Sequence, residues 1–391
     1  MKKKIYDFIL LLPWPICKLV IDMSDFCKGP SLCMTNRKQI KQFFKENLEI
    51  TEIDDRKMSS ADVKMWEKAL LYYAISSPRA ARKIADNFCR CSLKTLKEAD
   101  MTSVDSPVFL CVVKDDLERI KMSYEHHKSI GVKHFVYIDN GSTDGTLEWL
   151  LKQENVSVYQ TLDGFIMWAK VAWISKVITH IGFDKWYLIV DSDELFAYPD
   201  CETRTIQEYV SCLESKGITR DLSFMLDMYA TGKLFEADSE GNSIFNKYRY
   251  FDGSSYKKEN CLHYQKIKGG PRQRLFAEAG SMEMLQNKYP LVYYKRGEVY
   301  RYHYVSPYKH NFGVECTSAL LHYKFLDGDY EKYVKIANEG NYANGSRLYK
   351  DIIEKVDGNN ELYFYDENSV EYLSSQDLLK NCLVSEWKES K

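Results

Sequence analysis

The 391-residue chain lacks several features that would assign it directly to a class of protein. None of its 11 cysteines forms a Cys-x-x-Cys pair, and the closest two, Cys89 and Cys91, are too near for the usual zinc spacing. An odd, scattered set of cysteines favours reduced thiols over a disulfide framework. We therefore expect a cytoplasmic protein without a structural zinc site.

An excess of charge of either sign is also missing. The chain has 54 basic and 56 acidic residues and a net charge of −2, which gives no bulk electrostatic reason to bind nucleic acid. Internal repeats and low-complexity tracts are absent as well. With 45% hydrophobic and 28% charged residues, the composition is that of a folded protein of two domains, or of one large domain with extensions.

No uninterrupted apolar run reaches the ~20 residues of a membrane-spanning helix. Residues 5–21 come closest, after the basic Met1–Lys4, but Asp7, Pro13, Pro15 and Lys18 interrupt them and no small-residue cleavage site follows. Two interpretations are open. The segment packs on the body of the protein, or it lies in a membrane interface and makes the protein peripheral at the inner face of the plasma membrane.

The remaining chain is organised in three parts. Residues 1–104 predict a helical N-terminal extension, and residues 326–391 predict a helical C-terminal extension. Between them, residues 105–325 begin with alternating strands and helices, which is typical of an α/β fold with a mostly parallel central sheet. The expected strands are 108–113, 134–139, 156–159 and 186–190, and the expected helices are 115–130, 143–152 and 167–181.

Acidic residues follow three of these four strands. Ligands of open α/β sheets bind outside the carboxyl ends of the strands, so these residues mark the expected site. Crowded carboxylates repel one another, and a bound divalent cation is the simplest relief. The three segments are Lys114–Asp116, Asp139–Gly145 and Asp191–Glu194.

The triplet Asp191-Ser192-Asp193 is the sharpest of these segments. Alternate residues of an extended chain share a face, so both carboxylates can reach one ion. Carboxylates together with phosphate oxygens suit Mg²⁺ or Mn²⁺, which would neutralise a diphosphate. The alternative is an exposed acidic turn after a buried strand.

The loop Asp139–Gly145 is the second candidate. An acidic residue at the end of a strand can hydrogen-bond a ribose hydroxyl. Asn140 and the two glycines favour a tight turn in which the backbone can approach a ligand closely. The loop matches neither an EF-hand nor a phosphate-binding loop. The alternative is a polar turn in which Asp144 begins a helix.

These segments together resemble the family-2-like glycosyltransferases of the GT-A fold, in particular the bacterial surface-polysaccharide branch related to family 92. The resemblance is carried by VVKDDLERIKMSYEHHKSIGVKHFVYIDNGSTDGT and WYLIVDSDELFAYP, about 90 residues. It implies that residues 105–325 are a GT-A catalytic domain. It further implies that Asp139 and Asp144, with Asn140, hold the nucleoside and that Asp191 and Asp193 form the metal-binding DxD motif. Asp115-Asp116 stands where many relatives have Asn-Glu, and Asp115 is a further candidate for contact with the donor.

Two later segments extend the resemblance weakly. Gly269–Arg274 is similar to a glycine-rich loop of that branch, and Arg272 and Arg274 suit a diphosphate or an acidic sugar. The alternative is a solvated basic loop. His322, in an apolar run, matches a late histidine that is a third metal ligand, with His303 as its rival; a buried structural histidine is the alternative.

A general base is harder to place. Asp227 lies among apolar residues, and burial would raise its pKa toward that of a competent base. A buried structural aspartate is at least as good an interpretation. Asp193 and Glu194 are further catalytic candidates, although both lie close to the expected metal.

The sequence thus predicts a Mn²⁺- or Mg²⁺-dependent glycosyltransferase. It would move a sugar from a nucleotide-diphospho sugar to a glycan or lipid-linked acceptor in surface-polysaccharide synthesis, with inversion implied by the resemblance alone. Two alternatives stay open. One is a sugar nucleotidyltransferase, although Lys114–Asp116 lacks the glycine-rich loop of that class. The other is a non-catalytic protein that binds glycans or nucleotide sugars.

Overall fold

The computed structural model describes most of the chain: residues 30–74, 77–101, 105–236, 243–254, 256–260, 265–276, 284–307, 311, 314–359 and 361–387. The apolar segment 5–21 lies outside these residues. Among the helices described, none is long and apolar enough to cross a membrane.

The main sheet has six strands in the order β1-β4-β3-β2-β5-β12. Its four central strands are parallel, and the two edge strands, β1 and β12, run antiparallel to their neighbours. The fold is therefore α/β, as expected, and the sheet is mixed, with parallel central strands between two antiparallel edge strands. The strands are β1 (Lys94–Lys97), β2 (Val108–Val113), β3 (His134–Asp139), β4 (Val156–Gln160), β5 (Lys185–Ile189) and β12 (Leu291–Tyr294).

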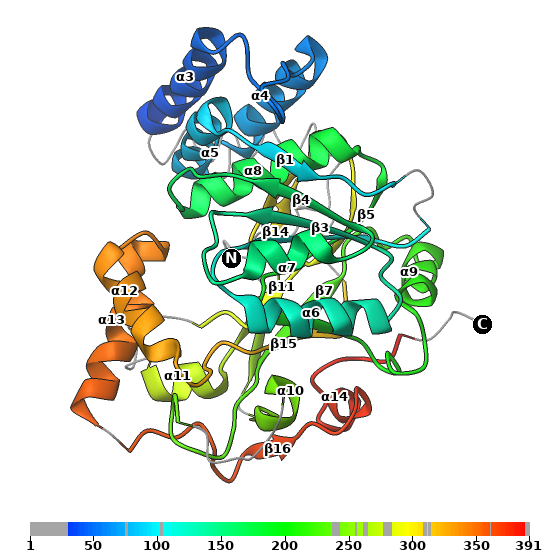
Figure 1. Cartoon of the computed structure of the whole chain (residues 1–391), viewed down its shortest axis with the longest axis vertical. Helices are drawn as coiled ribbons and strands as arrows, with labels where there is room; N and C mark the ends of the chain where they lie inside the picture. Colours follow the sequence, from blue (N-terminus) through cyan, green and yellow to red (C-terminus); the bar gives the residue numbers. More distant parts are fainter. Residues whose placement is uncertain are drawn as a thin grey trace.

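Helices cover both faces of this sheet, which is why β2 and β3 are apolar without alternation. Phe109 and Cys111 of β2 pack in one core cluster with α6, and Val108 and Leu110 pack in a second cluster with α8. Three N-terminal helices lie beyond α8 and share that second cluster (Figure 1). The helices are α3 (Pro30–Glu46), α4 (Ser60–Tyr73), α5 (Pro78–Arg90), α6 (Leu117–Ser129), α7 (Thr146–Lys152) and α8 (Met167–Ile181).

A second sheet, in the order β11-β7-β15-β6, was not expected from the sequence. Its strands β7 and β15 are parallel, whereas β6 and β11 run antiparallel to their neighbours. The strands are β6 (Glu194–Ala197), β7 (Leu222–Asp227), β11 (Asn287–Lys288) and β15 (Cys316–His322). Because Asp191–Asp193 joins β5 to β6, this short link connects the two sheets.

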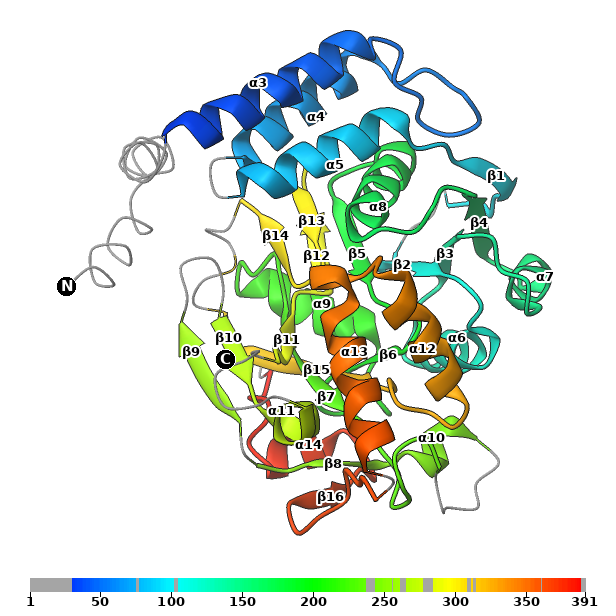
Figure 2. The ribbon, with the colours of Figure 1, turned by 90° about the vertical axis from the view of Figure 1, so that its left-hand side faces the viewer.

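Smaller elements surround the second sheet. Helices α12 and α13 lie side by side, as Figure 2 shows, and they pack on a third core cluster that includes Phe325 and Tyr333. The remaining elements are α9 (Ile206–Ser215), α10 (Ile244–Lys247), β8 (Tyr250–Asp252), β9 (Lys257–Asn260), β10 (Gln265–Lys268), α11 (Gly270–Phe276), β13 (Val299–Arg301), β14 (Tyr304–Ser306), α12 (Asp329–Glu339), α13 (Ala343–Gly358), β16 (Ser369–Glu371) and α14 (Gln376–Lys380).

Candidate functional site

Three loops at the carboxyl ends of β2, β3 and β5 are joined by hydrogen bonds. The backbone N–H of Asp115 donates to Oγ of Ser142 at 3.0 Å, which links the first loop to the second. The hydroxyl of Ser192 donates to the carboxylate of Asp116, which links the third loop to the first. The structure therefore brings the three acidic segments of the sequence to one edge of the main sheet.

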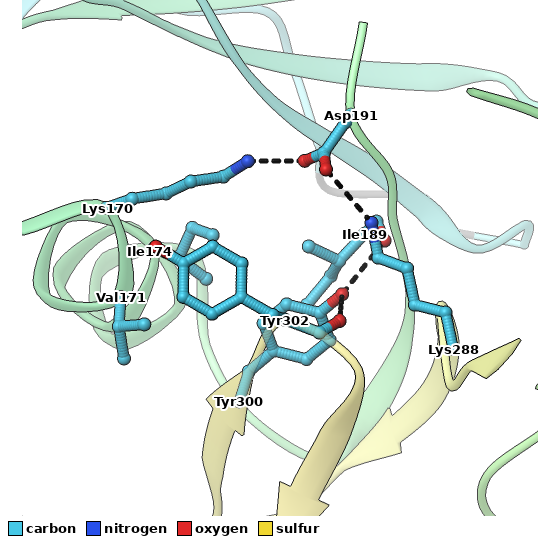
Figure 3. A pocket seen from close by; sticks show the side chains of 8 residues that line it. All are labelled: Lys170, Val171, Ile174, Ile189, Asp191, Lys288, Tyr300 and Tyr302. Atoms are coloured by element: carbon cyan, nitrogen blue, oxygen red, sulfur yellow. Dashed lines mark hydrogen bonds and ion pairs between the residues drawn. The ribbon is translucent and has the colours of Figure 1, made fainter. Parts of the chain in front are cut away.

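Asp191 is held by two lysines (Figure 3). Lys170, from the first turn of α8, pairs with Oδ1, and Nζ of Lys288, from β11, lies 3.4 Å from Oδ2. Burial acts to raise the pKa of Asp191, but the two ammonium groups outweigh burial and hold that pKa well below its ordinary range. Asp191 is therefore ionised, and both of its oxygens are engaged.

Lys288 also contacts the third acid of this link. Its Nζ lies 2.6 Å from Oε2 of Glu194, and the backbone N–H of Asp191 donates to the same oxygen at 2.8 Å. Lys288 and Glu194 are almost fully buried. Burial would lower the pKa of Lys288, but Asp191 and Glu194 outweigh burial and keep the ammonium charged. Burial raises the pKa of Glu194 despite this lysine, with Asp191 and Asp193 adding to the rise.

Asp193 begins a second chain of contacts. Its Oδ2 lies 3.3 Å from Nε2 of His322, and Nδ1 of His322 lies 2.7 Å from Oδ1 of Asp227. Strand pairing explains the second contact, since His322 and Asp227 are register partners at the ends of the parallel strands β15 and β7. Nε of Arg272 then donates to the other oxygen of Asp227 at 2.7 Å.

This chain of contacts overturns one expectation about Asp227. The side chain is buried, as expected, and burial alone would raise its pKa. However, Arg272 and His322 outweigh burial and hold the pKa well below its ordinary range. The expectation of a raised, base-competent pKa is therefore wrong. The contacts of Asp227 are those of a group that orients His322 and Arg272.

Five of the carboxylates at this edge contact basic side chains. Asp191 and Glu194 contact lysines, Asp193 contacts His322, and Asp227 contacts Arg272. Asp116 contacts Arg119 at 3.0 Å and Lys332 at 3.3 Å, and Arg119 also binds the carboxylate of Asp329. These internal cations relieve the repulsion among the carboxylates that they contact, so the repulsion alone does not require a divalent cation.

The expected metal ligands divide into two groups. Asp193 and His322 face each other, and Asp227 holds His322 as a carboxylate holds many metal-binding histidines. Asp191 does not fit a metal in this arrangement, because lysines occupy both of its oxygens. Within the described residues, no three histidine, cysteine or carboxylate side chains gather into one metal-binding group. The expectation of Mn²⁺ or Mg²⁺ stays a prediction.

The loop after β3 is shaped by its own side chains. Asp139 is fully buried, and it accepts hydrogen bonds from the N–H groups of Gly141 and Ser142 and from Gln160. Its predicted direct contact with the nucleoside does not fit this burial. Asn140 donates to the carbonyls of Thr161 and Asp163, whereas its buried Oδ1 has no partner in the described part of the chain.

Asp115 and Asp144 support the same loop from its exposed side. Asp115 accepts from the N–H of Thr143 at 2.7 Å, and Asp144 accepts from the N–H groups of Leu117 and Thr146. Burial opposes but does not cancel these bonds, which lower the pKa of Asp144. Both aspartates therefore have structural duties, and their contact with a donor stays a prediction.

Two further candidates, Arg274 and His303, form no ion pair with the members of this network. Arg274 pairs with Asp252 and Asp366, so it is not joined to Arg272 in one binding surface. His303 lies in the two-residue turn between β13 and β14, and its Nδ1 is 2.6 Å from the carbonyl of Asn287. Burial lowers the pKa of His303 to about 4, so its ring is neutral at pH 7.

Sequence reasoning missed the lysines and tyrosines around Asp191. They line a small pocket together with apolar residues: Lys170, Val171, Ile174, Ile189, Asp191, Lys288, Tyr300 and Tyr302. Tyr302 has a φ of 45°, which places its ring between α8 and the β13–β14 hairpin (Figure 3). Helix α8 is largely apolar but contains two lysines, Lys170 and Lys176, which were a usable signal, whereas β11 is too short to have identified Lys288.

Comparison with known proteins adds no family to this description: no protein-family model matches the chain, and no curated protein matches it.

Proposed function

We propose that this protein is a glycosyltransferase with a GT-A fold that uses a nucleotide-diphospho sugar as donor. The observation that carries the proposal is the meeting of three strand-end loops, with Asp191 and Asp193 on the link between the two sheets. Ligands of open α/β sheets bind at this edge. The charged side chains gathered there suit a donor that has both an anionic diphosphate and sugar hydroxyl groups.

In this proposal the loop after β3 receives the nucleoside. Asn140 helps to hold this loop, because its side-chain amide donates to the carbonyls of Thr161 and Asp163. Asp139 acts indirectly by holding Gly141 and Ser142 in place. The acceptor hydroxyl attacks the anomeric carbon with inversion, and the nucleoside diphosphate leaves toward the basic side chains around Asp191.

A divalent cation enters the proposal only through Asp193 and His322. When bound there, Mn²⁺ or Mg²⁺ would supply further positive charge to the diphosphate. Asp227 keeps His322 in position, and Arg272 keeps Asp227 ionised. The glycan or lipid-linked acceptor, a cytoplasmic membrane surface and a role in surface-polysaccharide synthesis belong to the same proposal.

A panel of nucleotides tests this function. The protein is titrated with UDP, GDP, CMP and TDP and with their sugars, with and without Mn²⁺, and the unfolding temperature is measured. A ligand at ~100 times its dissociation constant stabilises the fold by about 2.7 kcal/mol, a readily measured shift. We expect stabilisation by one nucleotide family, followed by slow release of nucleoside diphosphate from its sugar.

Two aspartate variants give the control. Asp193→Asn removes charge from the proposed site, whereas Asp55→Asn changes an exposed residue whose left-handed backbone asparagine also adopts. Asp193→Asn should weaken the effect of the nucleotide sugar, and Asp55→Asn should not. If no nucleotide shifts the unfolding temperature but glycans do, the chain is a glycan-binding protein. Release of pyrophosphate when a nucleoside triphosphate and a sugar 1-phosphate are supplied instead indicates the nucleotidyltransferase alternative.

A further inference from the structure

The ammonium group of Lys288 lies where a bridging cation would lie. Its Nζ contacts carboxylate oxygens of both Asp191 and Glu194, at 3.4 and 2.6 Å. Lys288 is only 3% exposed. In many acidic sites a divalent ion lies between two carboxylates and neutralises their charge. Here a buried lysine of the protein chain occupies that position.

Lys170 extends this arrangement toward the solvent. It pairs with the opposite oxygen of Asp191, so that Glu194, Lys288, Asp191 and Lys170 form a row of alternating charges. The inner pair, Lys288 and Glu194, is almost fully buried, whereas the side chain of Asp191 is 36% exposed and that of Lys170 is 11% exposed. Lys170 is therefore the lysine of this row that lies nearer to the solvent.

The first turn of α8 adds to the positive charge at this place. Ile166 precedes the helix and provides no side-chain cap, so the amino end of the helix keeps its partial positive charge near Lys170. The pocket below is bounded by Tyr300, Tyr302 and the apolar side chains of α8 and β5. The low polarity of the apolar walls strengthens the attraction between an ammonium group and an anion.

We propose that Lys170 and Lys288 do at Asp191 what a divalent cation would do, and that they bind the diphosphate of the donor. The inference rests on the proposed function for the identity of that diphosphate. The anion replaces the carboxylate of Asp191 as the ion-pair partner of Lys170, while Glu194 keeps Lys288 in position. Binding of a diphosphate at this place therefore needs no added metal.

Inorganic pyrophosphate is the first probe, because it tests the lysines without requiring the correct nucleoside. Its affinity is measured by calorimetry in EDTA. We expect the full chain to bind pyrophosphate and Lys170→Met to bind it about 10- to 100-fold more weakly, since a charge-assisted contact is lost. Lys64→Met, which changes an exposed lysine of α4, should bind as the unaltered protein does. Failure of the unaltered protein to bind pyrophosphate in EDTA would overturn the inference.

Mn²⁺ binding gives an independent measurement. Lys288→Ala removes the built-in cation and leaves the carboxylates of Asp191 and Glu194 without it. We expect this variant to bind Mn²⁺ at least tenfold more tightly than the unaltered protein, as followed by the loss of the free-ion signal in electron paramagnetic resonance. Equal or weaker Mn²⁺ binding would contradict the inference. If Lys288→Ala does not fold, the pyrophosphate comparison with Lys170→Met decides the question.

The two proposals fail in different ways. Pyrophosphate binding in EDTA that depends on Lys170, without binding of any nucleotide sugar, supports the lysine site and contradicts the proposed donor. Nucleotide-sugar binding that requires Mn²⁺ and is unchanged in Lys170→Met supports the proposed function and overturns the lysine site.

Discussion

At the scale of single residues, the candidate site is a set of ion pairs rather than a set of free acids. Asp227 illustrates the difference. Its position on an apolar strand indicated burial, and it is buried, but burial does not decide its charge. Arg272 and His322 contact its two oxygens and keep it ionised. A carboxylate held in this way positions other groups and is a poor acceptor of protons.

Replacing Asp227 tests this assignment. Asp227→Asn leaves Arg272 buried without its charge partner, and breaking a buried ion pair costs about 3–5 kcal/mol. We expect a loss of that order in the free energy of unfolding, measured in urea. Arg272→Met combined with Asp227→Asn should cost less than the sum of the two single changes, since the unpaired charge is then gone. A fully stable Asp227→Asn variant that lacks only turnover would instead identify Asp227 as the base.

At the scale of elements, strand pairing determines which residues meet. Asp227 and His322 lie 95 positions apart in the sequence, and they meet because β7 and β15 are parallel and in register. Helix α6 is fixed to β6 in a comparable way by His127. The backbone N–H of Phe196 donates to Nε2 of His127 at 3.1 Å, and Nδ1 lies 2.7 Å from the carbonyl of Ser123.

This contact predicts a pH dependence of stability. His127 is fully buried, and burial holds its pKa well below the ordinary 6.5, so the folded state binds fewer protons than the unfolded state. The stability linked to His127 is complete above pH ~6.5 and is lost as the pH falls, by about 1.4 kcal/mol per pH unit. His127→Gln should reduce this slope by one proton equivalent between pH 6.5 and 5, measured by urea unfolding. An unchanged slope would show that His127 is not kept neutral.

The elements differ in how well the sequence predicted them. The strands β2 and β3 and the helix α8 have the expected bounds, because continuous apolar runs and a terminal glycine are local signals. The strands β7 and β15 of the second sheet also lie in apolar runs, but nothing in the sequence showed that they pair. Its strands come from widely separated segments, and β11 has only two residues.

The same division holds for the candidate site. Acids at strand ends were visible in the sequence, since they follow recognisable strands. Their partners were not visible, because Lys170 and Lys288 reach Asp191 only through tertiary packing. The position of these acids at strand ends predicted that they lie at one edge of the sheet, and they do, but it did not predict the cations that neutralise them.

At the scale of the whole molecule, the N-terminal helices share a core with the main sheet. Trp66 of α4 is buried and donates to Oγ1 of Thr179 in α8 at 2.8 Å, and α5 packs against α8. The sheet also takes its edge strand β1 from this N-terminal part. Residues 30–101 and the central part of the chain are therefore expected to unfold together.

A substitution at Trp66 tests this cooperation. Trp66→Ala removes a large buried side chain and should lower the free energy of unfolding of the entire molecule by about 3–5 kcal/mol. Leu48→Ala changes a side chain that is 77% exposed and should have an effect within about 0.5 kcal/mol. Fluorescence and circular dichroism should report one common transition in urea. Two separate transitions, with only the first moved by Trp66→Ala, would show that the helices fold independently.

The link Asp191–Asp193 has a mechanical consequence. Its first acid is tied to a helix that packs on the main sheet, and its second acid is tied through His322 to the second sheet. The two carboxylates are two positions apart in the sequence, and Asp191 is tied to both sheets, because Lys288 of β11 also contacts it. A small molecule that binds both carboxylates would join the two sheets more rigidly at this link. Its binding would therefore restrict the motion of strands that it does not contact.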